Sequence, residues 1–305
     1  MRNLLLTPRD REILRHFSQV RLLNTAQVAA LVAPELKTDQ AIVRRLQLLA
    51  QAGYVYRLPN QVAVRVDPDT GRYAGKHKMV YALGTAGAVV LGEEGGTAAN
   101  VARARWDKKN REIKHTQIEH EIMISGVYTA LQIVGRLVSN MKLHDWHQGR
   151  ALCQFFHLNR DGEHVPNPSQ EEVELGLTRR CVCPDAYFCL YRPDTQGAIP
   201  CFLEADRSTM SVDRFCEKIE SYLLWKKARL HTTAFKFEKF FVLTVTPTES
   251  RRESLRKAAA KYARTEPETF RFATEKEYAA DPKKFVDRIW LLPLVDNLAR
   301  LSLFQ

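Results

Sequence analysis

The chain has 305 residues, with 45% hydrophobic and 27% charged side chains, which predicts a globular protein of two domains. No apolar run approaches 18 residues, and the start MRNLLLTPRDRE lacks the apolar core of a signal peptide, so we expect a cytoplasmic protein without a membrane span. The net charge of +11 is uneven: residues 1–114 hold 19 Lys and Arg against 10 Asp and Glu (+9), and residues 115–305 hold 27 against 25 (+2). This asymmetry favours a polyanionic partner for the first part.

Three helices are expected at the N-terminus. Thr7 is an N-cap with Pro8 at the first helical position. Asn24 or Thr25 caps a second, short helix, and a third runs from Thr38 to Ala52 and ends at Gly53. The apolar stripe of the third helix comprises Ile42, Leu46, Leu49 and Ala50.

The opposite face of this third helix has the residue types that read DNA bases. Arg can bind guanine and Gln can bind adenine in the major groove, mostly from the first half of a recognition helix. Arg45 can instead contact a phosphate. The residues predicted to face DNA here are Thr38, Gln40, Ala41, Arg44 and Arg45.

A hairpin wing follows the third helix. Strands at Tyr54–Leu58 and Met79–Leu83 flank a polar, basic stretch, and a helix from Thr85 to Leu91 closes the module. The basic residues assigned to DNA in this part are Arg57, Arg65, Arg72, Lys76 and Lys78. The whole pattern predicts a winged helix-turn-helix, and the alternative is a module that only contacts protein.

A basic segment with one tryptophan, Trp106, follows the glycine-rich residues 92–96. Basic residues beside an aromatic ring suit phosphate contact with stacking, whereas a solvated interdomain segment is the alternative. The candidate DNA contacts are Arg103, Arg105, Lys108 and Lys109. We therefore expect a DNA-binding domain over 1–92, a basic linker over 93–114 and an α/β domain over 115–305.

The remainder of the chain alternates helices and strands. This order predicts a three-layer α/β domain, so the fold class is α+β followed by α/β. The expected elements are a helix at 115–131, a strand at 137–146, a loop at 159–174, strands at 183–191 and 199–206, a helix at 211–230, a strand at 240–246, a helix at 251–264 and a strand at 288–292.

Acidic residues lie at two of these strands. Asp185 opens one strand, and Glu204 and Asp206 share a face at the end of the next. Whether Asp185 reaches Glu204 depends on the register; if it does, these carboxylates and Glu121 can hold Mg²⁺ or Mn²⁺, which activates water against a phosphodiester. The alternative is a solvated strand end at which Glu204 and Asp206 pair with Arg207 and Arg214.

Six cysteines are present, none in a CxxC pair. Cys181 and Cys183 would share a face of a strand, but two further zinc ligands at metal spacing are missing. The interpretation we favour is free thiols used as small core residues in a reducing compartment.

Several stretches together resemble the replication-relaxation family of plasmid and mobile-element proteins. They are LTPRDREIL, RRLQLLAQAGYV, YALGTAGA, CPDAYFCL, FLEADRST and KIESY, and the resemblance covers about Leu6 to Trp225. It implies a role in plasmid replication and DNA relaxation, with a second half like the PD-(D/E)xK nuclease fold.

On this resemblance, Asp185 and Glu204 match the acidic metal ligands, and Glu121 matches the acidic residue of the first nuclease helix. The nuclease pattern has Lys two residues after the second acid, where this chain has Asp206. Lys218, on the following helix, is the candidate replacement, and it shares a helical face with Arg214 and Tyr222.

Two functions follow from these residues. The first is a sequence-specific binder of double-stranded DNA, with a degenerate nuclease-like domain used for homodimerisation or for docking replication or mobilisation proteins. The second is a Mg²⁺-dependent endonuclease with Asp185, Glu204 and Lys218 as catalytic residues, and with Glu121, Asp185 and Glu204 as metal ligands. A ligand-responsive regulator is a third class, for which no phosphate loop or other pocket motif is present.

Overall fold

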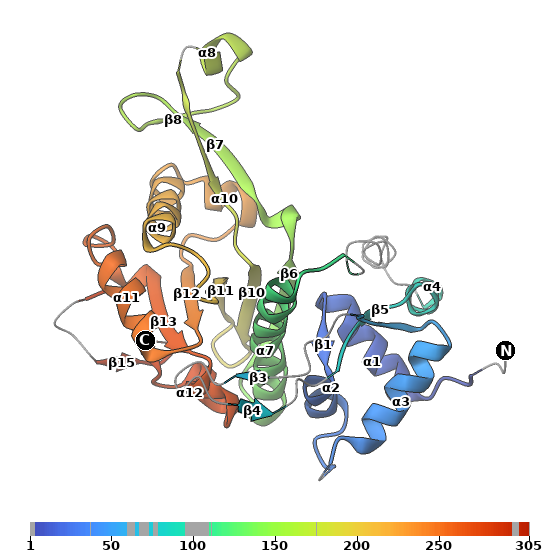
Figure 1. The fold of residues 1–305 in the computed structure, drawn as a ribbon. Helices are drawn as coiled ribbons and strands as arrows, with labels where there is room; N and C mark the ends of the chain where they lie inside the picture. The colour runs from blue at the N-terminus through green and yellow to red at the C-terminus, as the bar shows by residue number, and fades with distance from the viewer. Residues whose placement is uncertain are drawn as a thin grey trace. The chain divides into compact units, whose positions relative to one another are not determined.

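The computed structural model describes residues 4–36, 38–59, 65–66, 73–75, 79–94, 110, 112–174, 176–294 and 299–304 (Figure 1). The chain divides into two compact units, residues 1–137 and 138–305. The first unit ends with the long helix α7, His115–Leu137, which the sequence analysis grouped with the second domain.

In the described part of the first unit, the helices α1 to α4 and α7 accompany a small antiparallel sheet of order β1-β5-β2. Its elements are α1 Pro8–Gln19, β1 Leu23–Asn24, α2 Thr25–Val32, α3 Gln40–Gln51, β2 Val55–Arg57, β3 Arg65–Val66, β4 Tyr73–Gly75, β5 Val80–Leu83 and α4 Thr85–Glu93. Strands β3 and β4 pair with each other between β2 and β5 in the chain.

Local capping explains where the first helices begin. Thr7 caps α1 in a reciprocal capping box with Asp10, and Asn24 caps α2 in a second capping box with Gln27. Thr7 was the expected cap of α1, and Asn24 was one of the two residues expected to cap α2. Gly53 follows α3 with a φ of +78°, a left-handed conformation that glycine adopts without steric cost.

Helix α7 contacts α1, α2 and the turn before β1. The Ser125 hydroxyl donates to the carbonyl of Leu22 (2.5 Å), and the Gln27 amide donates to the carbonyl of Ile122 (2.9 Å). These hydrogen bonds, of which the first is buried, fix α7 within the first unit. The predicted start of the strand at 137–146 is wrong. Helix α7 continues to Leu137, because Leu131 and Val134 extend its buried stripe. The strand β6 begins only at Lys142.

A seven-stranded sheet forms the centre of the second unit, with order β15-β14-β13-β12-β11-β10-β6. Strands β6, β10 and β11 are antiparallel, whereas β11, β12 and β13 are parallel. The strands are β6 Lys142–Gln148, β10 Ala186–Arg192, β11 Gly197–Ala205, β12 Phe241–Thr246, β13 Phe270–Thr274, β14 Trp290–Leu291 and β15 Arg300–Leu301.

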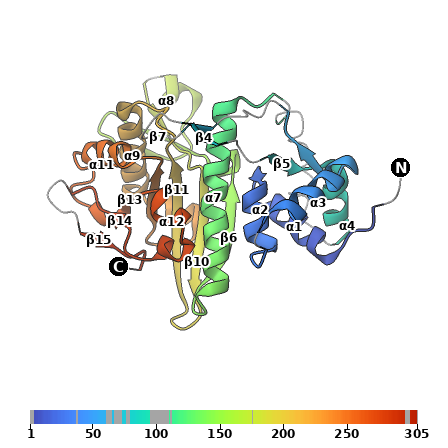
Figure 2. The same cartoon turned by 60° about the horizontal axis from the view of Figure 1, so that its bottom comes forward.

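Helical segments pack on both faces of this sheet. On one face, α9 (Val212–Lys227), α10 (Leu230–Phe235) and α11 (Glu249–Ala259) surround an aromatic cluster in which Phe202 contacts Tyr222, Trp225 and Phe240. On the other face lies α12 (Lys276–Ala279) (Figure 2). Phe285, in the 3₁₀ helix Pro282–Val286 that follows α12, contacts Phe188 of the sheet. The domain therefore has helical layers on either side of one sheet.

A second, smaller sheet of order β8-β7-β9 extends beyond the main sheet, with α8 at its far end (Figure 1). Its parts are β7 Gln154–Leu158, β8 His164–Val165, α8 Gln170–Glu174 and β9 Thr178–Val182. The segment 159–174, expected as a loop, thus contains β8 and α8. Within the described ranges, no helix has the length and hydropathy needed to cross a membrane.

The thiols do not all stay free, contrary to our expectation. Cys153, before β7, and Cys183, after β9, form a disulfide. Cys181 is a free, half-buried thiol, and Cys189, Cys201 and Cys216 are free and buried. The pairing of β7 with β9 brings together cysteines that are 30 residues apart in the sequence.

Candidate functional site

Glu204 near the end of β11 is the centre of a buried polar cluster in the second unit. Its side chain is almost fully buried. The Tyr222 hydroxyl donates to one carboxylate oxygen (2.8 Å), and the Lys218 ammonium donates to the other. Lys218 and Tyr222 lie one turn apart on α9, so a single helix face supplies both donors.

Asp185 joins this cluster through the register of two strands. Ala186 of β10 is paired with Leu203 of β11, which places Asp185 at the level of Glu204. The Asp185 amide donates to the carbonyl of Leu203 (2.9 Å), and its carboxylate accepts from the amide of Ala205 (2.7 Å). The structure thus brings Asp185, Glu204 and Lys218 together, which are the three residues that the sequence analysis singled out for catalysis.

The charges in this cluster act on one another. Burial raises the pKa of the Glu204 carboxyl, and the nearby Asp185 carboxylate raises it further, against the opposing effects of Lys218 and Tyr222. Burial lowers the pKa of Lys218, but the two carboxylates outweigh burial and leave that pKa above its ordinary value. Lys218 is therefore a cation held between two acidic groups.

Asp206 occupies the place where the nuclease pattern has lysine. Two nitrogen atoms of Arg251 in α11, Nε (2.8 Å) and Nη2 (2.9 Å), donate hydrogen bonds to the carboxylate of Asp206. Arg251 also donates to the carbonyl of Met210 (2.6 Å). Arg251 was not among the predicted site residues, because nothing in the chain order indicates that α11 reaches the end of β11.

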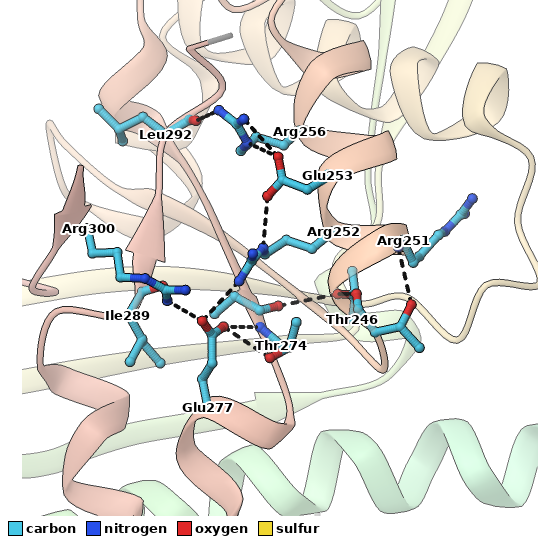
Figure 3. Close-up of polar contacts among 12 residues, drawn as sticks. Thr246, Arg251, Arg252, Glu253, Arg256, Thr274, Glu277, Ile289, Leu292 and Arg300 are labelled. Atoms are coloured by element: carbon cyan, nitrogen blue, oxygen red, sulfur yellow. Dashed lines mark hydrogen bonds and ion pairs between the residues drawn. The ribbon is translucent and has the colours of Figure 1, made fainter. Parts of the chain in front are cut away.

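The neighbouring arginines of α11 belong to a separate network (Figure 3). Arg252 donates to Glu277 of α12 (2.9 Å), and Arg256 donates to Glu253 (2.8 Å). Glu277 also accepts from the amide of Thr274 at the end of β13 (2.7 Å). In Figure 3 the Arg251 side chain points away from Glu277. Helix α11 therefore contacts Asp206 on one side, through Arg251, and Glu277 of α12 on the other, through Arg252.

The acidic pair fits a magnesium ion by its chemistry. Mg²⁺ takes oxygen ligands and commonly binds through one or two carboxylates while it keeps several waters. Asp185 and Glu204 would hold it, in competition with Lys218 for the Glu204 oxygen. Glu121 lies on α7 in the first unit, where its carboxylate accepts a hydrogen bond from Arg21 (3.0 Å).

Helix α3 presents the second candidate surface, in the first unit. Gln40, Ala41 and Arg44 are exposed on α3, and Thr38 is exposed just before it. Arg45 instead turns toward α1, where it donates to both oxygens of Asp10 (2.7 and 2.5 Å). Its guanidinium is thus engaged within the unit.

The basic residues of the wing and linker are placed only in part. Arg57 is exposed at the end of β2. Arg65 lies in β3, where the structure describes the backbone alone. The predicted contacts outside the described residues are Arg72, Lys76, Lys78, Arg103, Arg105, Lys108 and Lys109.

Comparison with known proteins gives one match. A family model described as replication-relaxation matches residues 14–236, which is more than half of the chain and includes both α3 and the acidic cluster. No curated protein and no solved structure matches the chain.

Proposed function

Because the chain belongs to the replication-relaxation family, we propose that it is a sequence-specific binder of double-stranded DNA from a plasmid or mobile element. In this proposal it acts in replication, DNA relaxation or transcriptional control. The first unit selects the DNA site, and the second unit serves for homodimerisation or for docking replication or mobilisation proteins.

The exposed polar face of α3 carries this proposal. Ile42, Leu46 and Leu49 are buried against the unit, so the opposite face, with Gln40 and Arg44, is left to solvent. The helices α1, α2 and α3, followed in the chain by the antiparallel partners β2 and β5, support a winged helix-turn-helix, in which α3 enters the major groove.

The topology of the second unit supports a nuclease-like origin. In chain order it has the three antiparallel strands β6, β10 and β11, then the helix α9, then the strand β12, which is parallel to β11; helix α7, at the end of the first unit, precedes them in the chain. This is the order we expect for the PD-(D/E)xK resemblance. The Lys218 contact with Glu204 and the ion pair of Asp206 with Arg251 both neutralise carboxylates from within the protein, which favours a domain that has lost catalysis.

Binding of selected duplex DNA tests the main proposal. Duplexes enriched by the protein from a random pool should share a motif, and Arg44→Ala should weaken binding by about 1–3 kcal/mol with relaxed preference at one base pair. Arg15→Ala removes the same charge from an exposed position on α1 and should leave the preference unchanged. Failure to enrich any motif would contradict sequence-specific binding.

A metal-dependent endonuclease is the second candidate function, favoured by the meeting of Asp185, Glu204 and Lys218. A bound Mg²⁺ would supply activation of water for attack on a phosphodiester. Asp185 and Glu204 would hold the ion, and Lys218 would place a positive charge beside the developing negative charge.

Cleavage of supercoiled plasmid with Mg²⁺ or Mn²⁺ separates the two functions. An endonuclease should nick or linearise the plasmid, and Asp185→Asn, Glu204→Gln and Lys218→Met should each abolish this. Lys227→Met, at an exposed position on the same helix, should cleave like the unaltered protein. Intact binding without cleavage of a plasmid that contains the enriched motif would reject the endonuclease.

A further inference from the structure

Three cysteines meet where the small sheet joins the rest of the second unit. Cys153 directly precedes β7, and Cys183 directly follows β9. In the β7–β9 ladder Gln154 is paired with Val182, which sets Cys153 opposite Cys183, and Cys181 lies two residues earlier on the same side of β9. The three sulfur atoms all lie within 4.8 Å of one another, and all three residues are half-buried.

This spacing is close to that of a zinc–thiolate centre. Zn–S bonds of about 2.3 Å in a tetrahedral site put sulfur atoms about 3.8 Å apart, so small side-chain movements would complete the geometry. Among the residues that the structure describes, no His, Asp or Glu joins the three cysteines as a further ligand. The fourth position would therefore be taken by water or by an external ligand.

Two cations, Arg179 and Lys218, act electrostatically on the sulfur of Cys181. A zinc ion bound by three thiolates has a net charge of −1, which these two cations would stabilise. Buried cysteines elsewhere in the unit, such as Cys189 and Cys201, have no comparable set of neighbouring thiols among the described residues.

We propose that Cys153, Cys181 and Cys183 form a binding site for Zn²⁺ or another thiophilic ion of the same geometry. The Cys153–Cys183 disulfide is the oxidised form of this site, and it excludes the metal because only thiolates are strong ligands. This inference is independent of the proposed DNA-binding function, since it rests on the β7–β9 ladder alone.

The first test is metal binding by the full chain after reduction with a water-soluble phosphine. The phosphine gives two electrons to the S–S bond and becomes its oxide with oxygen from water, while the sulfurs become two thiols. The reduced protein should then bind one Zn²⁺ per chain. Co²⁺ in its place should give a thiolate-to-metal charge-transfer band in the ultraviolet.

Cys153→Ser, Cys181→Ser and Cys183→Ser should each lower zinc affinity by more than the roughly 10–100-fold that loss of an outer-shell partner costs. Cys216→Ala removes a buried thiol outside the cluster and should bind zinc like the unaltered protein. Absence of stoichiometric zinc in the reduced protein, or retention of zinc by all three serine variants, would overturn the proposal.

A second measurement needs no variant, and so remains decisive if a serine variant fails to fold. The reduced, unaltered protein is alkylated with and without Zn²⁺, and each cysteine is followed by mass spectrometry. Zinc should slow alkylation of Cys153, Cys181 and Cys183 at least tenfold and leave the rate at Cys216 unchanged. Equal rates with and without zinc at the three cysteines would refute the site.

Discussion

His16 is a titratable group held in its neutral form where α1 meets α7. Its Nδ1 lies 2.8 Å from the Tyr128 hydroxyl, and the imidazole is almost wholly buried. Burial, with a smaller effect of the Arg136 cation, lowers the pKa of His16 from 6.5 to about 4. The folded state therefore binds a proton less readily than the unfolded chain, and folding is linked to pH through this residue.

Stability should accordingly fall on acidification. The neutral, buried His16 contributes fully to the free energy of unfolding above pH 6.5, and this contribution is lost as the pH falls toward 4. The free energy of unfolding of the first unit should therefore drop by about 2 kcal/mol between pH 7 and pH 5. Urea denaturation at several pH values measures this. His16→Gln should remove that part of the pH dependence; an unchanged profile in this variant would show that another group is responsible.

Arg45 and Arg44 are neighbours with different surroundings, which gives a matched pair. Arg45 donates two hydrogen bonds to the carboxylate of Asp10, a residue that is only 1% exposed, whereas Arg44 faces solvent. Arg45→Ala leaves a buried carboxylate without its cation and should destabilise the first unit by about 3 kcal/mol. Arg44→Ala should change stability by less than about 0.5 kcal/mol. Equal effects of the two variants in urea denaturation would contradict this assignment.

At the scale of elements, two glycines explain a sequence motif. In YALGTAGA, Gly84 lies over the carbonyl of Gly53, and Gly87 lies over the carbonyl of Tyr54. A methyl group at either position would overlap the backbone of the α3–β2 turn. Both positions therefore require glycine, because the start of α4 lies so close to this turn that no side chain fits between them.

Gly87→Ala should destabilise the first unit by about 1–3 kcal/mol, because the backbone that it meets cannot rotate away as a side chain can. Thermal unfolding followed by circular dichroism measures the change. Val89→Ala shortens an exposed side chain of the same helix and should have little effect. A Gly87→Ala variant as stable as the unaltered protein would show that α4 can move off the turn.

Elements determined by local chemistry were predictable from the sequence, and those determined by long-range pairing were not. Thr7, Asn24 and Gly53 act within a few residues of their own positions, so their roles could be predicted. Strand β13 was missed because Phe270–Thr274 is short and follows irregular chain. The site was partly predictable: Asp185, Glu204 and Lys218 were named, but their meeting depends on the β10–β11 register.

Partners from distant elements could not be found in this way. Arg251 reaches Asp206 only because α11 packs beside α9. The same holds for Cys153, whose partner lies 30 residues away. Neither pairing has a local sequence signal, since both depend on how whole strands and helices are placed.

At the scale of the whole molecule, the uneven charge predicts the response of DNA binding to salt. Residues 1–114 hold a net charge of +9, and binding that neutralises six phosphates gives a slope of about −5 in log K against log salt. Fluorescence anisotropy with the full chain at several salt concentrations measures this slope. An affinity that hardly changes with salt would contradict binding to the phosphate backbone.

The bidentate pair of Asp206 and Arg251 also couples two positions that are 45 residues apart in the chain. A single exchange of Asp206 for lysine would set two cations against each other and would leave Arg251 without its carboxylate. A stable chain with lysine at position 206 would therefore need a second, compensating change at Arg251, and the variant with only one of the two changes would be less stable. The residue that position 206 can accept thus depends on the residue at position 251.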